Sequence, residues 1–150
     1  MIHNPKSKFL QWRFVWPWLL VLAVFGVISW FSAQPGEISD IHTEMAKELL
    51  GAQAGWVDPF VRKFAHVGLF FALGAASAFA WLRWGKPFRK VLLYTVVLCG
   101  ILGGLDEFHQ LFVPERAGLL SDVLLDTVGA TLGALCVTGL SKTLAKSAKY

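Results

Sequence analysis

Apolar residues gather into four long runs along the chain, at residues 14–32, 63–82, 90–112 and 118–140. A helix needs about 20 predominantly apolar residues to cross roughly 30 Å of hydrocarbon, so each run has the length of a membrane span. The composition agrees, because 55% of the residues are hydrophobic and only 16% are charged. The pattern predicts an all-α, polytopic membrane protein that forms one domain with four transmembrane helices.

The third run carries polar residues where a membrane helix should be ending. Its apolar part, Val91 to Leu105, is fifteen residues long. At 1.5 Å per residue this part covers only about 22 Å, which is less than the hydrocarbon thickness. The segment 106–113, DEFHQLFV, is therefore expected to complete the span. Pro114 and Gly118 then predict a tight turn before the fourth run.

The segment between the first two runs has a different pattern. Ile38, Ile41, Met45 and Leu49 recur at helical spacing, and Gly51 follows as a stop signal. This pattern predicts a short amphipathic helix in the loop between the first and second transmembrane helices. Two roles are open to such a helix: it covers the polar residues at the ends of the other helices, or it contacts a ligand.

The basic residues predict how the chain is oriented in the membrane. Segments 1–13, 83–90 and 141–150 carry ten of the fourteen Lys and Arg residues and no acid, whereas all ten acids lie within 37–126. The positive-inside rule places both termini and the loop 83–90 in the cytoplasm and the polar residues on the extracytoplasmic side. We expect the lipid bilayer as a partner and no nucleic acid, because the net charge of +4 is spread along the chain.

Ionisable and amide side chains are expected to converge at the outer ends of the last three spans. Residues three or four apart share a helix face. Such groups are Lys63 with His66, Asp106 with His109 and Gln110, and Asp122 with Asp126, while Glu107 is about 100° around the helix from Asp106. An ionised acid in the membrane interior costs at least about 2.5 kcal/mol, so these acids are candidates for a functional site. The alternative is a structural network in which Arg62, Lys63 and Arg116 neutralise them.

Other kinds of site have weaker sequence support. Cys99 and Cys136 lie inside apolar runs and are expected to be packing residues rather than disulfide partners. A metal site built from His66, His109 and the carboxylates is an alternative, but no HExxH or similar spacing supports it, so neither a metal nor another cofactor is predicted. No serine or cysteine nucleophile motif is visible either, so any hydrolysis is expected to use water.

Four motifs together resemble the VanZ-like membrane proteins. They are FSAQPG after the first span, RKFAHVGLFFALG in the second, LDEFHQLFVPER in the third and LSDVLLDTVGATLGA in the fourth. The resemblance covers nearly the whole chain and implies a single VanZ-like domain in a bacterial cell membrane, linked to resistance to teicoplanin and related glycopeptides. It also adds Gln34 of FSAQPG to the candidate ligand-binding residues. The chain departs from the family where Gly68, Leu69 and Phe70 follow the histidine, and where Glu115 replaces the glycine usual before the arginine.

Three classes of function remain open. The first is an enzyme acting on an anionic lipid-linked or cell-wall precursor at the outer leaflet, and the second is a module that binds or shields this ligand without chemistry. The third is a proton-coupled carrier, which we rank last because the inner halves of the spans lack ionisable residues. The candidate acid and base residues are His66, Asp106, Glu107, Asp122 and Asp126; the candidate ligand-binding residues are Gln34, Arg62, Lys63, His109, Gln110 and Arg116. Fully ionised, this set is negative, so binding an anion requires a neutral acid, for which Asp126 is the deepest candidate. The oligomeric state has no signal in the sequence.

Overall fold

The computed structural model describes residues 5–35, 41, 44–45, 48 and 57–147. These residues form four long α-helices and no strand, which confirms the all-α prediction. The helices are α1 (Pro5–Ser32), α3 (Val57–Arg83), α4 (Phe88–Gln110) and α5 (Leu120–Ser147). The predicted amphipathic helix between the first two spans lies mostly outside the described residues.

Each of the four described helices is long and apolar enough to cross a membrane. The apolar segments are Trp12–Ser32, Lys63–Arg83, Phe88–Gln110 and Leu120–Ser147. The polar residues Asp106 to Gln110 form the last turns of α4, as the length of the third apolar run predicts. Leucine and phenylalanine side chains such as Leu120 and Phe112 are exposed on the outside of the bundle, which is the surface that would meet lipid.

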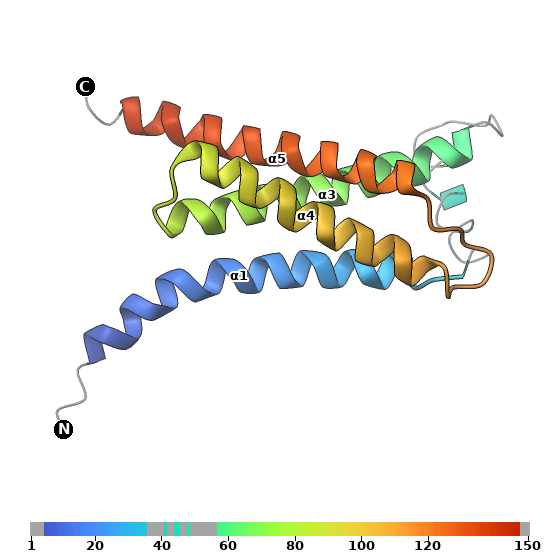
Figure 1. The fold of residues 1–150 in the computed structure, drawn as a ribbon, viewed down its shortest axis with the longest axis horizontal. Helices are drawn as coiled ribbons and strands as arrows, with labels where there is room; N and C mark the ends of the chain where they lie inside the picture. Colours follow the sequence, from blue (N-terminus) through green and yellow to red (C-terminus); the bar gives the residue numbers. More distant parts are fainter. Residues whose placement is uncertain (1–4, 36–40, 42–43, 46–47, 49–56, 148–150) are drawn as a thin grey trace.

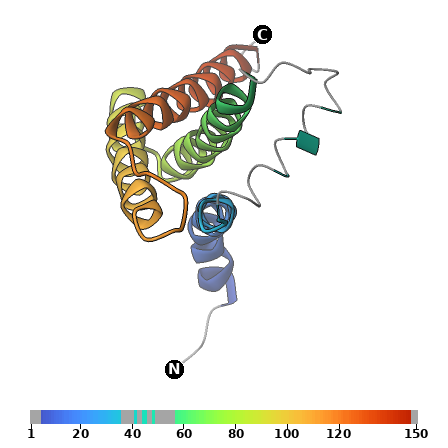
Figure 2. The same cartoon turned by 90° about the vertical axis from the view of Figure 1, so that its right-hand side faces the viewer.

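Helices α3, α4 and α5 lie side by side, and α1 packs against α3 and α4 (Figures 1 and 2). The start of α1, the turn between α3 and α4, and the end of α5 lie at one end of the bundle (Figure 1). At this end the Trp84 indole Nε1 donates a hydrogen bond to the Phe14 carbonyl oxygen at 3.1 Å. The Lys142 Nζ lies 3.5 Å from the centroid of the Phe88 ring. The basic segments therefore gather at one end, and the loop between α4 and α5 lies at the other.

The contact between α3 and α5 brings two helix backbones together. A Cβ atom on Gly129 would lie only 2.6 Å from the Val67 carbonyl oxygen, and one on Gly133 would collide with the Phe71 carbonyl oxygen. From the other side, a Cβ on Gly74 would collide with the backbone of Ala130. Only glycine permits so close an approach, which is how small residues drive helix association in membranes. This contact fixes α5, and with it Asp126, against α3.

An apolar cluster lies beneath the polar end of the bundle. Ile28 of α1, Phe70 and Leu73 of α3 and Cys99 of α4 are fully buried in it. Cys99 is thus a packing residue, as predicted, while Cys136 is exposed on α5, and both are free thiols. The cluster holds α1 against the other helices and so sets the position of the last turn of α1.

Candidate functional site

A cavity of about 280 Å³ opens between α3, α4, α5 and the loop that joins α4 to α5. It lies at the end of the bundle opposite the basic segments. Most of the predicted site residues meet here. The polar residues that line it are Lys63, His66, Glu107, Gln110, Glu115, Arg116, Asp122 and Asp126.

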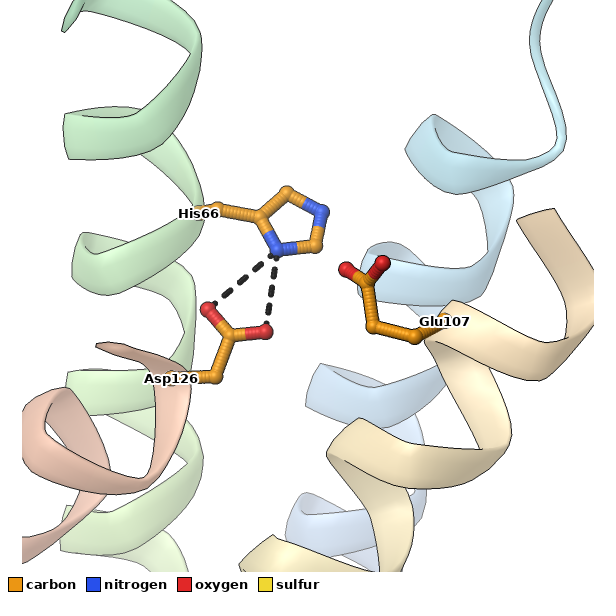
Figure 3. A group of neighbouring side chains, drawn as sticks. All are labelled: His66, Glu107 and Asp126. Carbon is orange, nitrogen blue, oxygen red and sulfur yellow. Dashed lines mark hydrogen bonds and ion pairs between the residues drawn. The ribbon is translucent and has the colours of Figure 1, made fainter. Parts of the chain in front are cut away.

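His66, Glu107 and Asp126 form the centre of the site, one from each of three helices (Figure 3). The His66 Nδ1 lies 3.3 Å from one carboxylate oxygen of Asp126 and 3.4 Å from the other. One donor atom from each of the three residues can be chosen so that all lie within 4.8 Å of one another. Asp126 and Glu107 are 1% and 6% exposed, so both acids are withdrawn from bulk water.

A second, fully buried polar group holds the other side of the histidine ring. The Ser32 hydroxyl at the end of α1 donates to the Asp106 Oδ2 at 2.7 Å, and the His66 Nε2 lies 3.3 Å from the Ser32 oxygen. The Gln110 amide nitrogen donates to the Asp106 Oδ2 at 3.0 Å. Sequence reasoning missed Ser32, because it is the last residue of an apolar run and no local pattern marks it. The FSAQPG motif was the one signal that contained it.

Ser32, His66 and Asp126 contact one another in space as a serine, histidine and aspartate do in a hydrolase triad, but the geometry does not support a nucleophilic serine. The Ser32 proton is committed to Asp106, whereas a catalytic serine gives its proton to the histidine. Ser32 is also only 1% exposed and does not line the cavity. Its hydroxyl therefore orients the ring and connects α1 to the site.

The rim of the cavity carries the basic side chains. The Lys63 Nζ forms an ion pair with the Asp122 Oδ1 at 2.9 Å. The Arg116 Nε donates to the backbone oxygen of Gln34 at 3.3 Å, which connects the α4–α5 loop to the end of α1. Gln34 thus contributes its main chain, and its side chain does not line the cavity.

The loop after α4 has a constrained backbone. Glu115 has a φ of 61°, in the left-handed region that favours glycine. The Leu119 N–H donates to the Glu107 Oε2 at 2.8 Å, and a Cβ atom on Gly118 would collide with the Glu107 carbonyl oxygen. The turn predicted at Pro114 to Gly118 therefore packs directly against Glu107. A positive φ at position 115 explains in physical terms why a glycine is usual before the arginine in the VanZ-like pattern, where this chain has Glu115.

Besides Gln34, two further predicted ligand residues are not placed in the cavity. His109 is exposed and does not line it, so the structure does not bring it to the cavity together with Gln110. At 100° per residue, Asp106, Gln110 and Glu107 fall within about 100° of one another, while His109 lies about 60° outside that arc. Arg62 belongs to α3, but its side chain is outside the part of the structure described.

The charges around the cavity do not balance within the described residues. Glu107, Glu115, Asp122 and Asp126 line it together with two permanent cations, Lys63 and Arg116. Asp106 is buried directly behind the histidine ring, with its second oxygen, Oδ1, lacking a hydrogen-bond partner among the described residues. The centre of the site is therefore negative and its rim contains the basic groups, so a further positive centre would be stabilised between the acids.

Four apolar helices around a buried group of ionisable side chains define a multi-pass α-helical membrane protein. The sequence model of the VanZ/LLP1 family matches residues 16–142, most of the chain, and the chain belongs to this family. The match confirms the resemblance seen in the four motifs. No curated protein and no solved structure matches the chain.

Proposed function

We propose that this protein binds the anionic head group of a lipid-linked cell-wall precursor at the outer leaflet of the bacterial cell membrane, and thereby influences susceptibility to teicoplanin. The observation that carries the proposal is the position of Arg116 and Lys63 at the rim of a cavity whose interior is polar and lies within the bundle. Membership of the VanZ/LLP1 family supports the link to glycopeptides.

The position of the cavity suits an amphipathic ligand. It opens at the end of the bundle away from the basic segments, which the positive-inside rule assigns to the cytoplasm. A lipid in the outer leaflet would present its head group at this depth while its chains stay against the exposed apolar side chains of the helices. Arg116 suits a phosphate, because its planar guanidinium can make two hydrogen bonds to one anion, which a lysine cannot reproduce.

A second candidate function is hydrolysis or transfer at the bound head group. The favouring observation is His66, which lies against Asp126 and also lines the cavity. Because the His66 Nε2 lies against the Ser32 hydroxyl, the Nδ1 would be the nitrogen that takes a proton from a water molecule as general base. A carrier has less support, because the buried carboxylates lie in the last turns of α4 (Asp106 and Glu107) and near the start of α5 (Asp126), at one end of the described helices.

The test is the binding of a polyprenyl phosphate to purified protein, measured by native mass spectrometry. Arg116→Lys should weaken binding by about 10-fold and Arg116→Gln by about 100-fold, because a hydrogen bond to a charged group contributes about 1.5 to 3 kcal/mol. Arg89→Gln is the matched control, since Arg89 is exposed at the start of α4, whereas the cavity lies at the end of this helix. Equal retention of the lipid by the wild type and Arg116→Gln would overturn the proposal.

Arg116 also contacts the backbone of Gln34, so folding must be checked separately. The thermal unfolding of each variant gives this check, and Lys63→Gln offers a second loss of a rim cation. Incubation with precursor lipids followed by mass spectrometry of the lipids separates binding from catalysis. Teicoplanin susceptibility of a host expressing each variant then connects the binding data to the phenotype.

A further inference from the structure

The three residues at the centre of the site have the donor atoms of a metal site. A ring nitrogen of His66, an oxygen of Glu107 and an oxygen of Asp126 come from α3, α4 and α5 and lie within 4.8 Å of one another (Figure 3). We propose that these three side chains bind one divalent metal ion of the Zn²⁺ or Mn²⁺ class, and that this ion holds the phosphate of the ligand. The metal–phosphate contact rests on the proposed function, whereas the metal site itself does not.

The hydrogen bonds around the histidine ring support a cation at this point. Ser32 has one hydroxyl hydrogen, and the short 2.7 Å contact with Asp106 uses it. The His66 Nε2 must therefore donate to the Ser32 oxygen, which leaves the Nδ1 of a neutral ring as an acceptor. That acceptor faces both carboxylate oxygens of Asp126, and acceptors repel one another unless a positive centre lies between them. A proton can join two of the three groups, whereas a metal ion satisfies all three at once.

Partners outside the three residues already orient two of the three proposed ligands. A metal-bound histidine nearly always donates its other ring N–H to a fixed acceptor, and the Ser32 hydroxyl backed by Asp106 has this place behind His66. The Glu107 carboxylate is oriented by two donors, the Leu119 N–H at 2.8 Å from the Oε2 and the Gln110 amide nitrogen at 3.5 Å from the Oε1. Contacts of this kind, which hold the ligand side chains from outside, are what a preformed metal site requires.

Burial and charge point the same way. Asp106, Glu107 and Asp126 are 2%, 6% and 1% exposed, and ionised carboxylates at this depth are costly unless they are compensated. The Lys63 ammonium is 2.9 Å from Asp122 and is thereby engaged at the rim. A divalent ion between Glu107 and Asp126 would compensate both charges. It would also present a positive centre to a phosphate, so the binding of an anion would no longer require a neutral acid.

The donor set indicates the class of metal. One imidazole nitrogen with two carboxylates suits Zn²⁺ or Mn²⁺ better than Mg²⁺ or Ca²⁺, which prefer oxygen ligands alone. Three protein ligands leave coordination positions open, and these would face the cavity. The three residues come from three helices, so no local spacing such as HExxH marks the site in the sequence. For this reason the sequence does not predict a metal.

The test uses the full chain, purified in detergent without a histidine tag and treated with a chelator. Zn²⁺ and Mn²⁺ are then titrated separately, and the bound metal is measured by elemental analysis after gel filtration and, for Mn²⁺, by electron paramagnetic resonance. We expect one ion per chain. Asp126→Asn and Glu107→Gln should each weaken binding by more than about 100-fold, since loss of an outer partner alone costs 10- to 100-fold.

Two further variants separate a metal site from a general effect of charge. Glu115→Gln removes an acid that lines the same cavity but lies outside the three ligands, so it should leave the affinity unchanged. Ser32→Ala should weaken binding by about 10-fold by releasing the histidine ring. Retention of no more Zn²⁺ or Mn²⁺ by the wild type than by Asp126→Asn would overturn the metal site. An equal loss of affinity in Glu115→Gln would also overturn it, because attraction by charge alone would then explain the binding.

Failure of the metal site and failure of the proposed function give different results. If the protein binds one metal ion but no polyprenyl phosphate with or without metal, the proposed function is wrong and the metal site stands. If the polyprenyl phosphate binds equally well with chelator and in Asp126→Asn, the head-group site stands and the metal does not hold the phosphate. The expected result is binding of the lipid that falls at least 10-fold on chelation and returns on addition of Zn²⁺ or Mn²⁺.

Discussion

Two neighbouring regions of the bundle are built in opposite ways. One is the backbone contact between α3 and α5, and the other is the polar site. The contact uses Gly74, Gly129 and Gly133, whose lack of side chains lets the two backbones touch. The site, beginning one turn away, holds Asp126 and Glu107 out of water. The glycine contact already fixes α5 against α3. Apolar side chains would fill the space of the polar site without the cost of burying charge. This difference is a reason for our proposal that the acids serve a ligand rather than stability.

If the polar end of the bundle is its outer end, labelling from outside the cell gives an all-or-none result. In a chain whose native Cys99 and Cys136 are replaced by alanine, single cysteines at Pro114 and Lys86 mark the two ends. A membrane-impermeant thiol reagent added to whole cells should label Pro114→Cys and leave Lys86→Cys unlabelled until the cells are opened. The reverse pattern would place the site on the cytoplasmic side.

The largest loss of stability is expected at the backbone contact. Gly133→Leu would force a side chain into the Phe71 carbonyl and should lower the free energy of unfolding by more than about 4 kcal/mol, or prevent folding. Gly139→Leu is the matched control on the same helix, since nothing lies within 4 Å of its Cβ position. Thermal unfolding in detergent measures both. A mild effect at Gly133 would mean that the two helices are not in backbone contact.

Asp126→Asn should have the opposite profile, with a small effect on stability and a large one on binding. The amide keeps the shape of the carboxylate and can still accept a hydrogen bond, so we expect unfolding to change by about 1 kcal/mol or less. Binding of the polyprenyl phosphate and any teicoplanin phenotype should be lost. A loss of stability as large as the loss of binding would favour a purely structural network, in which Asp126 serves to hold His66.

Glu115→Gly should give the smallest effect and should raise stability. A residue with a side chain in the left-handed region costs about 1 to 2 kcal/mol more than glycine there, although glycine also gains freedom in the unfolded chain. We therefore expect a net gain of about 1 kcal/mol in the free energy of unfolding. Glu115→Gln keeps the strained φ and removes the charge, so it should show no such gain. A gain of similar size in both variants would assign the effect to charge.

Much of the architecture could be predicted because its signals are local. The four apolar runs specify four helices, and the short third run predicts that DEFHQ belongs to α4, as it does. The residues Lys63, His66, Glu107, Gln110, Arg116, Asp122 and Asp126 were all expected at one site, and all line one cavity. Membrane helices make this possible, since a polar residue in an apolar segment has few places to go except toward other polar residues.

Other parts of the site depend on how the helices pack, which no local pattern contains. His109 turns out of the cavity because the rotation of α4 faces Asp106, Glu107 and Gln110 inward. Ser32 lies next to His66 and Asp106 because the apolar cluster packs the end of α1 against α3 and α4. The meeting of His66, Glu107 and Asp126 requires three helices at once, with α5 brought to α3 by Gly129 and Gly133. Spacing along one helix establishes which residues share a face, whereas the point at which faces from different helices meet is set by their packing distances and rotations.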